Sequence, residues 1–206
     1  MATTARADLR RRGLLLEYLT IGWNVVEGVV AMVAALTSGS IALLGFGLDS
    51  FVESASGAVL VWRLRAEDED TDAEAIERLE HRALRLVGAS LFGLAAFVAV
   101  RAGIALVNQE RPEASPLGIG VTAVSLVVMW WLARVKRRTA AALESRALEA
   151  DAFQTTACWW LSLIALVGIG LNAAVGWWWA DPIAALGMTY FLVAEGLEAW
   201  KGERDD

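Results

Sequence analysis

Long apolar stretches alternate with short polar segments along almost the whole chain. About 20 helical residues span a hydrocarbon core of roughly 30 Å, so an apolar stretch of that length predicts a transmembrane helix. Six such stretches are bounded by charge, proline or turn residues, at about residues 13–36, 41–62, 83–107, 116–133, 148–175 and 182–200. No segment has the alternating pattern of a strand. The sequence therefore predicts an all-α membrane protein with six transmembrane helices.

The connections between these stretches predict which helices are neighbours. The turn 37–40 is so short that the first two stretches must form a hairpin. The segment 108–115 contains a proline and is followed by another, and both break helices, so it is expected as a short turn. The segment 176–179 combines a glycine with three tryptophans, which favour the membrane interface.

The orientation follows from the basic residues, because cytoplasmic loops keep an excess of Lys and Arg. With both termini in the cytoplasm, every basic residue except Arg101 and Arg111 lies on the cytoplasmic side. On this side we expect an acidic linker or frayed helix at 66–80, with His81 in the same loop, and a loop that carries the basic cluster 134–146.

The chain is expected to be one transmembrane domain over residues 1–206. The first apolar stretch is too long for a cleaved signal peptide and carries Glu17, so we expect it to remain as a helix. The short tail after Trp200 leaves no room for a soluble C-terminal domain.

Composition excludes several other classes of protein. With 57% of its residues apolar and 10 tryptophans, the chain is too apolar for an ordinary soluble domain. A single cysteine cannot form an internal disulfide, and a net charge of −6 argues against a nucleic-acid partner. No nucleophile–base arrangement, phosphate loop or cofactor motif is present, so we expect no enzyme. Rich use of Ala, Gly and Arg favours a bacterial inner (plasma) membrane.

Two carboxylates stand inside the second apolar stretch. Asp49 and Glu53 are four residues apart, which places both on one helical face with Cβ atoms about 6 Å apart. Counted from Ile41, they lie roughly 12 and 18 Å below the membrane boundary, near the midplane. Two like charges at this depth are stable only if a cation neutralises them or if one of them is protonated. The pair therefore points to a cation/proton exchanger.

The fifth stretch carries a matching polar stripe. Gln154 and Cys158 are also four residues apart, and Asp151 precedes them by one turn. Counted from Leu148, the first two lie about 9 and 15 Å deep, so they can meet the carboxylates if the second and fifth helices are neighbours. Oxygen donors with one thiolate suit a borderline divalent ion such as zinc, cobalt or cadmium. Asp151 is a reserve ligand, although a helix cap is its simpler role.

Three motifs along the chain resemble the cation diffusion facilitator, or cation efflux, family. SGSIALL at 38–44 with DSFVE at 49–53 is similar to the family's S-G-S-x-A-L-L followed by H/D-x-x-x-D. LEADAFQ at 148–154 with Cys158 resembles A-D-A-x-H-x-x-x-D, and DPIAA at 181–185 resembles D-P-I-x-A. The matches occur in the family's order and cover essentially the whole chain.

The resemblance implies a six-helix bundle, usually dimeric, that exports divalent cations in exchange for protons. Its tetrahedral metal site would here comprise Asp49 and Glu53, then Gln154 where the family has His and Cys158 where it has Asp. Glu lengthens one arm, Gln does not titrate, and Cys is a softer ligand than Asp. We expect zinc, cobalt, cadmium, iron or manganese as the transported ion, and a homodimer held by the membrane helices.

Two other functions remain open. Glu17 and Glu27 fall near one face of the first stretch, where they could take part in proton coupling, and Glu27 is the deeper of the two. In a proton-coupled exporter of organic cations, one of them would bind the substrate with help from tryptophan rings. A non-transporting membrane scaffold or sensor with a degenerate metal site is the other alternative.

Overall fold

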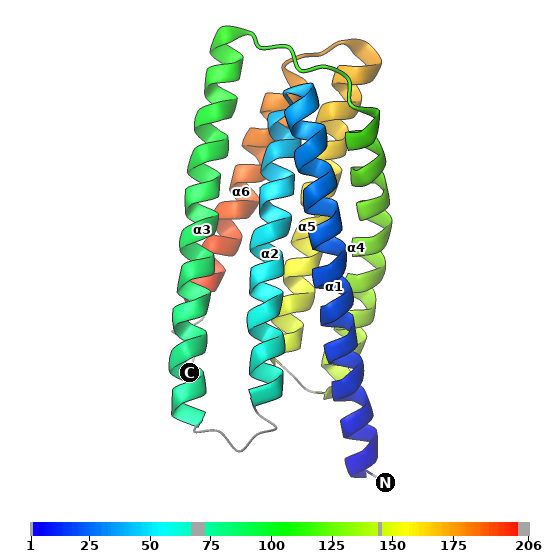
Figure 1. Ribbon diagram of the computed structural model, residues 1–206, viewed down its shortest axis with the longest axis vertical. Helices are drawn as coiled ribbons and strands as arrows, with labels where there is room; N and C mark the ends of the chain where they lie inside the picture. The colour runs from blue at the N-terminus through cyan, green and yellow to red at the C-terminus, as the bar shows by residue number, and fades with distance from the viewer. Residues whose placement is uncertain (1, 67–72, 144–145, 202–206) are drawn as a thin grey trace.

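The computed structural model describes residues 2–66, 73–143 and 146–201, and these residues form six helices without a strand. The helices are α1 (Ala2–Ser38), α2 (Ile41–Ala66), α3 (Ala73–Asn108), α4 (Pro116–Leu143), α5 (Arg146–Val175) and α6 (Ala180–Lys201). They run along one common direction as a bundle (Figure 1). The predicted all-α class is confirmed.

Five helices within the described residues are long and apolar enough to cross a membrane. They are the segments Arg11–Ser38, Ile41–Arg63, His81–Asn108, Pro116–Leu143 and Asp151–Val175. The sixth predicted span, in α6, is not among them, because Asp181, Glu195 and Glu198 lower the mean hydropathy of this short helix. It nevertheless packs against α3 and α5 within the same bundle.

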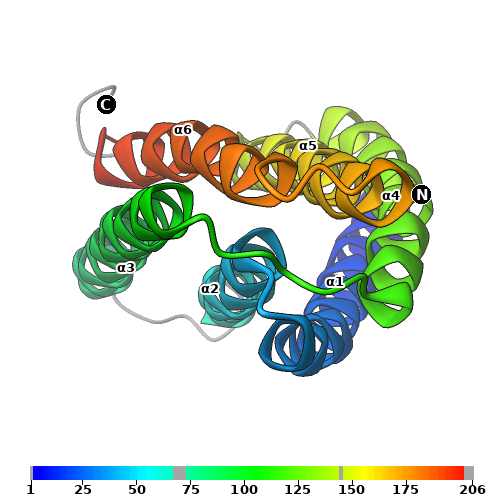
Figure 2. The ribbon, with the colours of Figure 1, turned by 90° about the horizontal axis from the view of Figure 1, so that it is seen from above.

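The bundle has two layers of three helices (Figure 2). The helices α3, α2 and α1 form one layer, and α6, α5 and α4 form the other. Helix α2 is central, because it contacts α1, α3, α5 and α6. The turns from α1 to α2, α3 to α4 and α5 to α6 share one end of the bundle, whereas α1 begins and α6 ends at the other (Figure 1). The contact between α2 and α5 confirms that the second and fifth helices are neighbours.

Two expected loops are helical at the end of the bundle where α1 begins. Helix α3 begins at Ala73 and contains His81, so the expectation of a loop at His81 is wrong. The expectation of a loop directly after residue 133, which would carry the basic cluster, is also wrong, since α4 continues to Leu143. Charged residues such as Lys, Arg and Glu are good helix formers, so they end an apolar stretch without ending the helix. Residues 67–72 of the acidic linker lie outside the described part.

Helices α1 and α2 approach closely at two glycines. A Cβ atom on Gly47 would lie 3.2 Å from the carbonyl oxygen of Gly28 and 3.1 Å from the backbone nitrogen of Met32. Small residues allow such close contact between backbones in lipid, where the hydrophobic effect does not drive helices together. This contact holds the inner faces of α1 and α2 side by side.

The start of α2 is bound by a carboxylate of α6. Gly39, with φ 73°, reverses the chain after α1, and Ser40 then accepts a hydrogen bond from the Leu43 N–H at 3.1 Å. The Ser40 hydroxyl donates to Asp181 at 2.5 Å, and the Ile41 N–H donates to the same carboxylate at 2.8 Å. The carboxylate thus satisfies N–H groups that have no partner within the helix, at the positive end of the helix dipole.

We expect Asp181→Ala to lower the free energy of unfolding by about 1–3 kcal/mol, because the variant leaves buried donors at the start of α2 without an acceptor. Denaturation of the detergent-solubilised protein, followed by tryptophan fluorescence, measures the change. Glu113→Ala, which removes an exposed carboxylate from the neighbouring connection, is the matched control. Equal transitions for the two variants would show that the Asp181 contacts contribute nothing.

Candidate functional site

Buried polar side chains form a column through the bundle, which we call the polar column. Each of its members exposes less than a tenth of its surface, although most are charged or hydrogen-bonding groups inside a membrane bundle. The members from α1, α2, α4, α5 and α6 are Glu17, Asn24, Glu27, Asp49, Ser50, Glu53, Ser125, Lys136, Cys158, Ser162 and Glu195. Members that contact one another lie at similar heights along the bundle, and we call each such group a level of the column.

The middle level joins the predicted stripes of α2 and α5. The thiol of Cys158 donates to Glu53, and the Asn24 amide donates to the other carboxylate oxygen at 3.0 Å. One turn away, the Ser56 hydroxyl donates to the Gln154 side-chain oxygen at 3.3 Å. The structure therefore brings Glu53 and Cys158 into contact, with Gln154 beside them.

Asp49 and Glu195 form the least compensated part of the column. Asp49 is 2% exposed and Glu195 is 7% exposed, yet one oxygen of the first and both oxygens of the second have no hydrogen-bond partner. The two side chains lie within electrostatic range of each other, and Glu195 is within range of Glu53. Uncompensated carboxylates from α2 and α6 thus face the same interior region.

The next level satisfies Glu27 completely. The Ser50 hydroxyl donates to one of its oxygens at 2.9 Å, and the Trp23 indole N–H donates to the other at 2.6 Å. Ser125 of α4 also donates to this second oxygen, and the Ser162 hydroxyl of α5 lies 3.1 Å from Ser125. Donors from α1, α2 and α4 therefore meet at the carboxylate that the sequence analysis assigned to proton coupling, and α5 is linked to it through Ser125.

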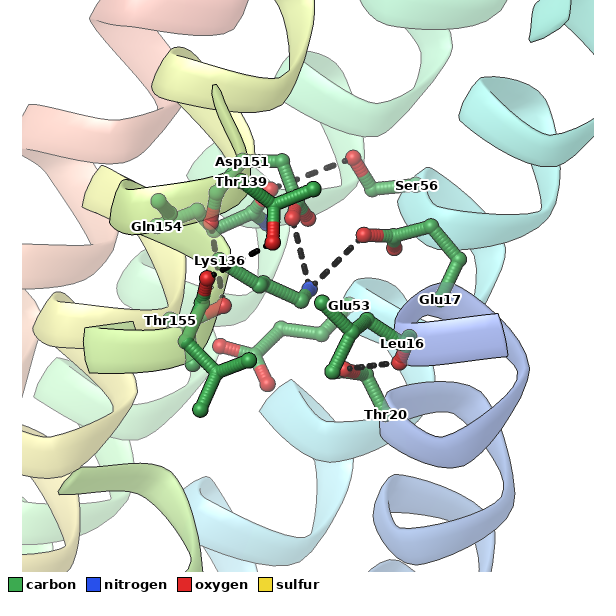
Figure 3. Close-up of polar contacts among 12 residues, drawn as sticks. Leu16, Glu17, Thr20, Glu53, Ser56, Lys136, Thr139, Asp151, Gln154 and Thr155 are labelled. Atoms are coloured by element: carbon green, nitrogen blue, oxygen red, sulfur yellow. Dashed lines mark hydrogen bonds and ion pairs between the residues drawn. The ribbon is translucent and has the colours of Figure 1, made fainter. Parts of the chain in front are cut away.

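The opposite end of the column contains an ion-pair cluster. Lys136 of α4 lies 3.0 Å from Glu17 of α1 and 2.6 Å from Asp151 of α5 (Figure 3). Both Lys136 and Glu17 have fully buried side chains, and that of Asp151 is 14% exposed. Because α5 begins at Arg146, the interpretation of Asp151 as a helix cap is wrong.

Sequence reasoning missed two ionisable members of the column, Lys136 and Glu195. Lys136 lay in a basic cluster just beyond the fourth apolar stretch, which was expected to end at residue 133. Buried positions nevertheless continue through α4 at helical spacing as Leu132, Ala133, Lys136, Thr139 and Ala140. Glu195 lay within the sixth predicted span and was not chosen as a site residue. In both cases the signal was an ionisable residue on the inner face of a long helix.

The expected metal ligands are only partly assembled. Within the described ranges, no three His, Cys, Asp or Glu side chains are grouped so that they could hold a metal ion. Glu53 is hydrogen-bonded to Cys158 and Asn24. Gln154 is hydrogen-bonded to Ser56, and Asp49 lies one turn before Glu53 on α2. An ion that binds these side chains must therefore replace existing hydrogen bonds.

A comparison with known families identifies the bundle. A family model described as the cation efflux transmembrane domain matches residues 18–202, which include most of every helix. The chain belongs to the cation efflux family. It is a multi-pass membrane protein of this family, as its several helices long enough to span a membrane also indicate.

Two curated relatives of the cation efflux chain are similar over most of its length. One is an uncharacterised transporter of Synechocystis, 30% identical over 185 residues, which cover 86% of this chain and 58% of the relative. The other is the cation-efflux pump FieF of Shewanella oneidensis, 27% identical over 160 residues, which cover 76% of this chain and 54% of the relative. The chain spans about half the length of these curated relatives.

The motifs that resemble the family have different roles in the structure. Ser40 and Asp181, from the first and last motifs, meet as the cap of α2 and contribute to packing. Asp49, Glu53 and Cys158 instead lie in the polar column. Ser40 and Asp181 therefore join α2 to α6, whereas the other three residues are candidates for ion binding.

We expect the Cys158 thiol to react with N-ethylmaleimide at least about tenfold more slowly in the folded protein than in SDS, because thiol reactivity requires access and thiolate character. Mass spectrometry follows the modification, and this cysteine is the single one in the chain. The control is Glu113→Cys in a Cys158→Ser background, which should react at similar rates in both conditions. Equal rates for Cys158 would contradict its buried position.

Proposed function

We propose that the protein transports a divalent metal cation through the polar column and exports it in exchange for protons. The observation that carries this proposal is the set of buried carboxylates of α2 and α6. Among the described residues, Asp49, Glu53 and Glu195 have no ion-pair partner, although they lie in the interior of an apolar bundle. Membership of the cation efflux family and similarity to a protein named as a cation-efflux pump support it.

The charge of this region favours a cation as the substrate. Ionised carboxylates in a bundle surrounded by lipid are costly unless an opposite charge neutralises them. A divalent ion neutralises two carboxylates at once, which matches Asp49 and Glu53 at adjacent turns of α2. We therefore propose Asp49, Glu53, Gln154 and Cys158 as the ligands that bind the ion during transport.

The donor set determines which metals are suitable. Carboxylate oxygens alone bind magnesium, calcium or manganese, whereas a thiolate prefers softer ions. Cys158 already contacts Glu53, so a shared ligand set favours zinc, cobalt or cadmium, and iron or manganese should bind less well. The thiol must lose its proton to bind a metal, and this links metal binding to proton release.

Protons complete the proposed cycle. After the metal leaves, a proton on Asp49 or Glu53 restores the charge balance of the interior before the bundle returns to its first state. Glu27 and Glu17 lie at levels of the column on either side and are proposed to assist proton movement. The remaining expectations belong to the same proposal: a homodimer in a bacterial plasma membrane, with metal leaving on the outer side.

A second candidate function has one observation in its favour. A pocket of about 250 Å³ lies between α5 and α6, where Phe153, Trp160 and Tyr190 surround it together with Glu195 and Glu198. Aromatic rings beside carboxylates suit an organic cation through cation–π contacts. In this case Glu195, rather than the Glu17 or Glu27 of the sequence-based hypothesis, would bind the substrate.

We expect purified protein in liposomes to move zinc, cobalt or cadmium when a pH gradient is imposed, and Asp49→Asn to reduce the flux to that of empty liposomes. The substitution keeps the size of the side chain and removes the negative charge that the ion requires. A metal-sensitive dye inside the liposomes measures the flux. Glu113→Gln, an exposed change, should transport as the unmodified protein does.

Other outcomes of this assay would overturn the proposal. If aromatic cations move and Glu195→Gln stops them while Asp49→Asn does not, the protein is an organic-cation exporter. If metal binds but no gradient moves it, the protein is a scaffold or sensor.

We expect Gln154→His to tighten zinc binding about tenfold relative to manganese, because an imidazole nitrogen replaces a weak amide oxygen in the donor set. Competition titrations with a fluorescent chelator measure both affinities. Gln154→Leu is the control and should weaken binding of both metals. An unchanged zinc-to-manganese ratio in Gln154→His would exclude this position from the ligand set.

A further inference from the structure

Lys136 occupies an unusual position for an ammonium group. Its side chain is fully buried, and it contacts carboxylates that come from two other helices, Glu17 of α1 and Asp151 of α5. The second oxygen of Glu17 lies against α2, 3.6 Å from the position of a Cβ atom on Gly57. Four helices therefore meet around one positive charge, as the converging side chains in Figure 3 show.

The ammonium neutralises its surroundings only in part. Two carboxylates and one ammonium carry a formal net charge of −1 when all three are ionised. The ammonium is at ion-pair distance from both carboxylates. A divalent cation would balance both carboxylates, which the single charge of Lys136 does not.

The cluster lies directly on the path along the polar column. On α5, Asp151 precedes Gln154 by three residues and Cys158 by seven, and the longer separation corresponds to about 10 Å along the helix. Ser56 and Gln154 separate the cluster from the level of Glu53 and Cys158. Lys136 lies in the last third of α4 and Asp151 near the start of α5, and both of these helix ends lie at the end of the bundle where α1 begins (Figure 1). A cation that enters from that end therefore reaches this cluster before it reaches Glu53.

We propose that Glu17 and Asp151 form a second cation site, which Lys136 fills with its own ammonium and vacates when a divalent cation passes. The inference rests on the proposed function, since it concerns the same transported ion. The flexible four-carbon stem of lysine allows the ammonium to withdraw along α4. Lys136 thus acts as an attached competitor that blocks the site in this conformation and prevents the cation from remaining there.

The decisive experiment measures cation binding after the central ligands have been removed. In an Asp49→Asn/Glu53→Gln background, cobalt binding is measured by equilibrium dialysis with and without Lys136→Met. We expect Lys136→Met to bind one cobalt ion per chain, at least about tenfold more tightly than the background does, because two carboxylates lose their attached counter-ion. Addition of Glu17→Gln should abolish this binding.

Transport measurements supply the second readout. With the central ligands intact, Lys136→Met should lower the apparent KM for cobalt and also lower the maximal rate, since the cation now stays at Glu17 and Asp151. A purely structural role would lower the amount of folded protein without this split. Arg138→Met, which removes an exposed charge from the same helix, is the matched control and should leave both values unchanged.

A variant that retains the charge covers the case in which Lys136→Met does not fold. Lys136→Arg keeps the ion pairs and holds both carboxylates with a fork of donors, so the apparent KM for cobalt should rise at least about threefold. An unchanged KM for Lys136→Arg would overturn the inference, as would a folded Lys136→Met that binds no extra ion. Absence of transport in the unmodified protein would instead refute the proposed function.

Discussion

A polar side chain inside this bundle can find a partner only within the protein or in a bound substrate, because the surrounding lipid offers none. This constraint orients the helices. Each of α1, α2, α4 and α5 turns a polar stripe inward, while large apolar side chains such as Leu36, Val107 and Val127 are mostly exposed on the outside. The polar column is therefore the element around which the packing is organised, and the glycine contact between α1 and α2 brings its first two stripes together.

The levels of the column differ in how far their charges are compensated. Glu27 has donors on both oxygens, and Lys136 lies between two carboxylates, so these levels can exist without any ligand. Asp49 and Glu195 have neither arrangement. The contrast between these levels is the physical basis of the proposed cation pathway, because a buried carboxylate without a partner in the protein is the group that a cation from outside would neutralise.

The sequence predicted the helices well, because the length of an apolar stretch is set by the membrane itself. It also predicted that Asp49 and Glu53 share a face of α2 and that Cys158 can reach them, since helical geometry alone fixes these positions. It did not predict Lys136 or Glu195 as partners, because the orientation of α4 and α6 depends on contacts between distant helices. A basic residue next to exposed arginines looks the same in sequence whether it faces water or the interior.

The carboxylate of Asp181 has a consequence for how the bundle can move. It fastens the first turn of α2 to the first turn of α6 through the Ser40 hydroxyl and two backbone N–H groups. Because the two helices are joined at this end, an opening between them would widen toward the opposite end. The Asp181 contacts would then act as a hinge near the short turns. In such a motion the side chains furthest from this hinge would be displaced the most.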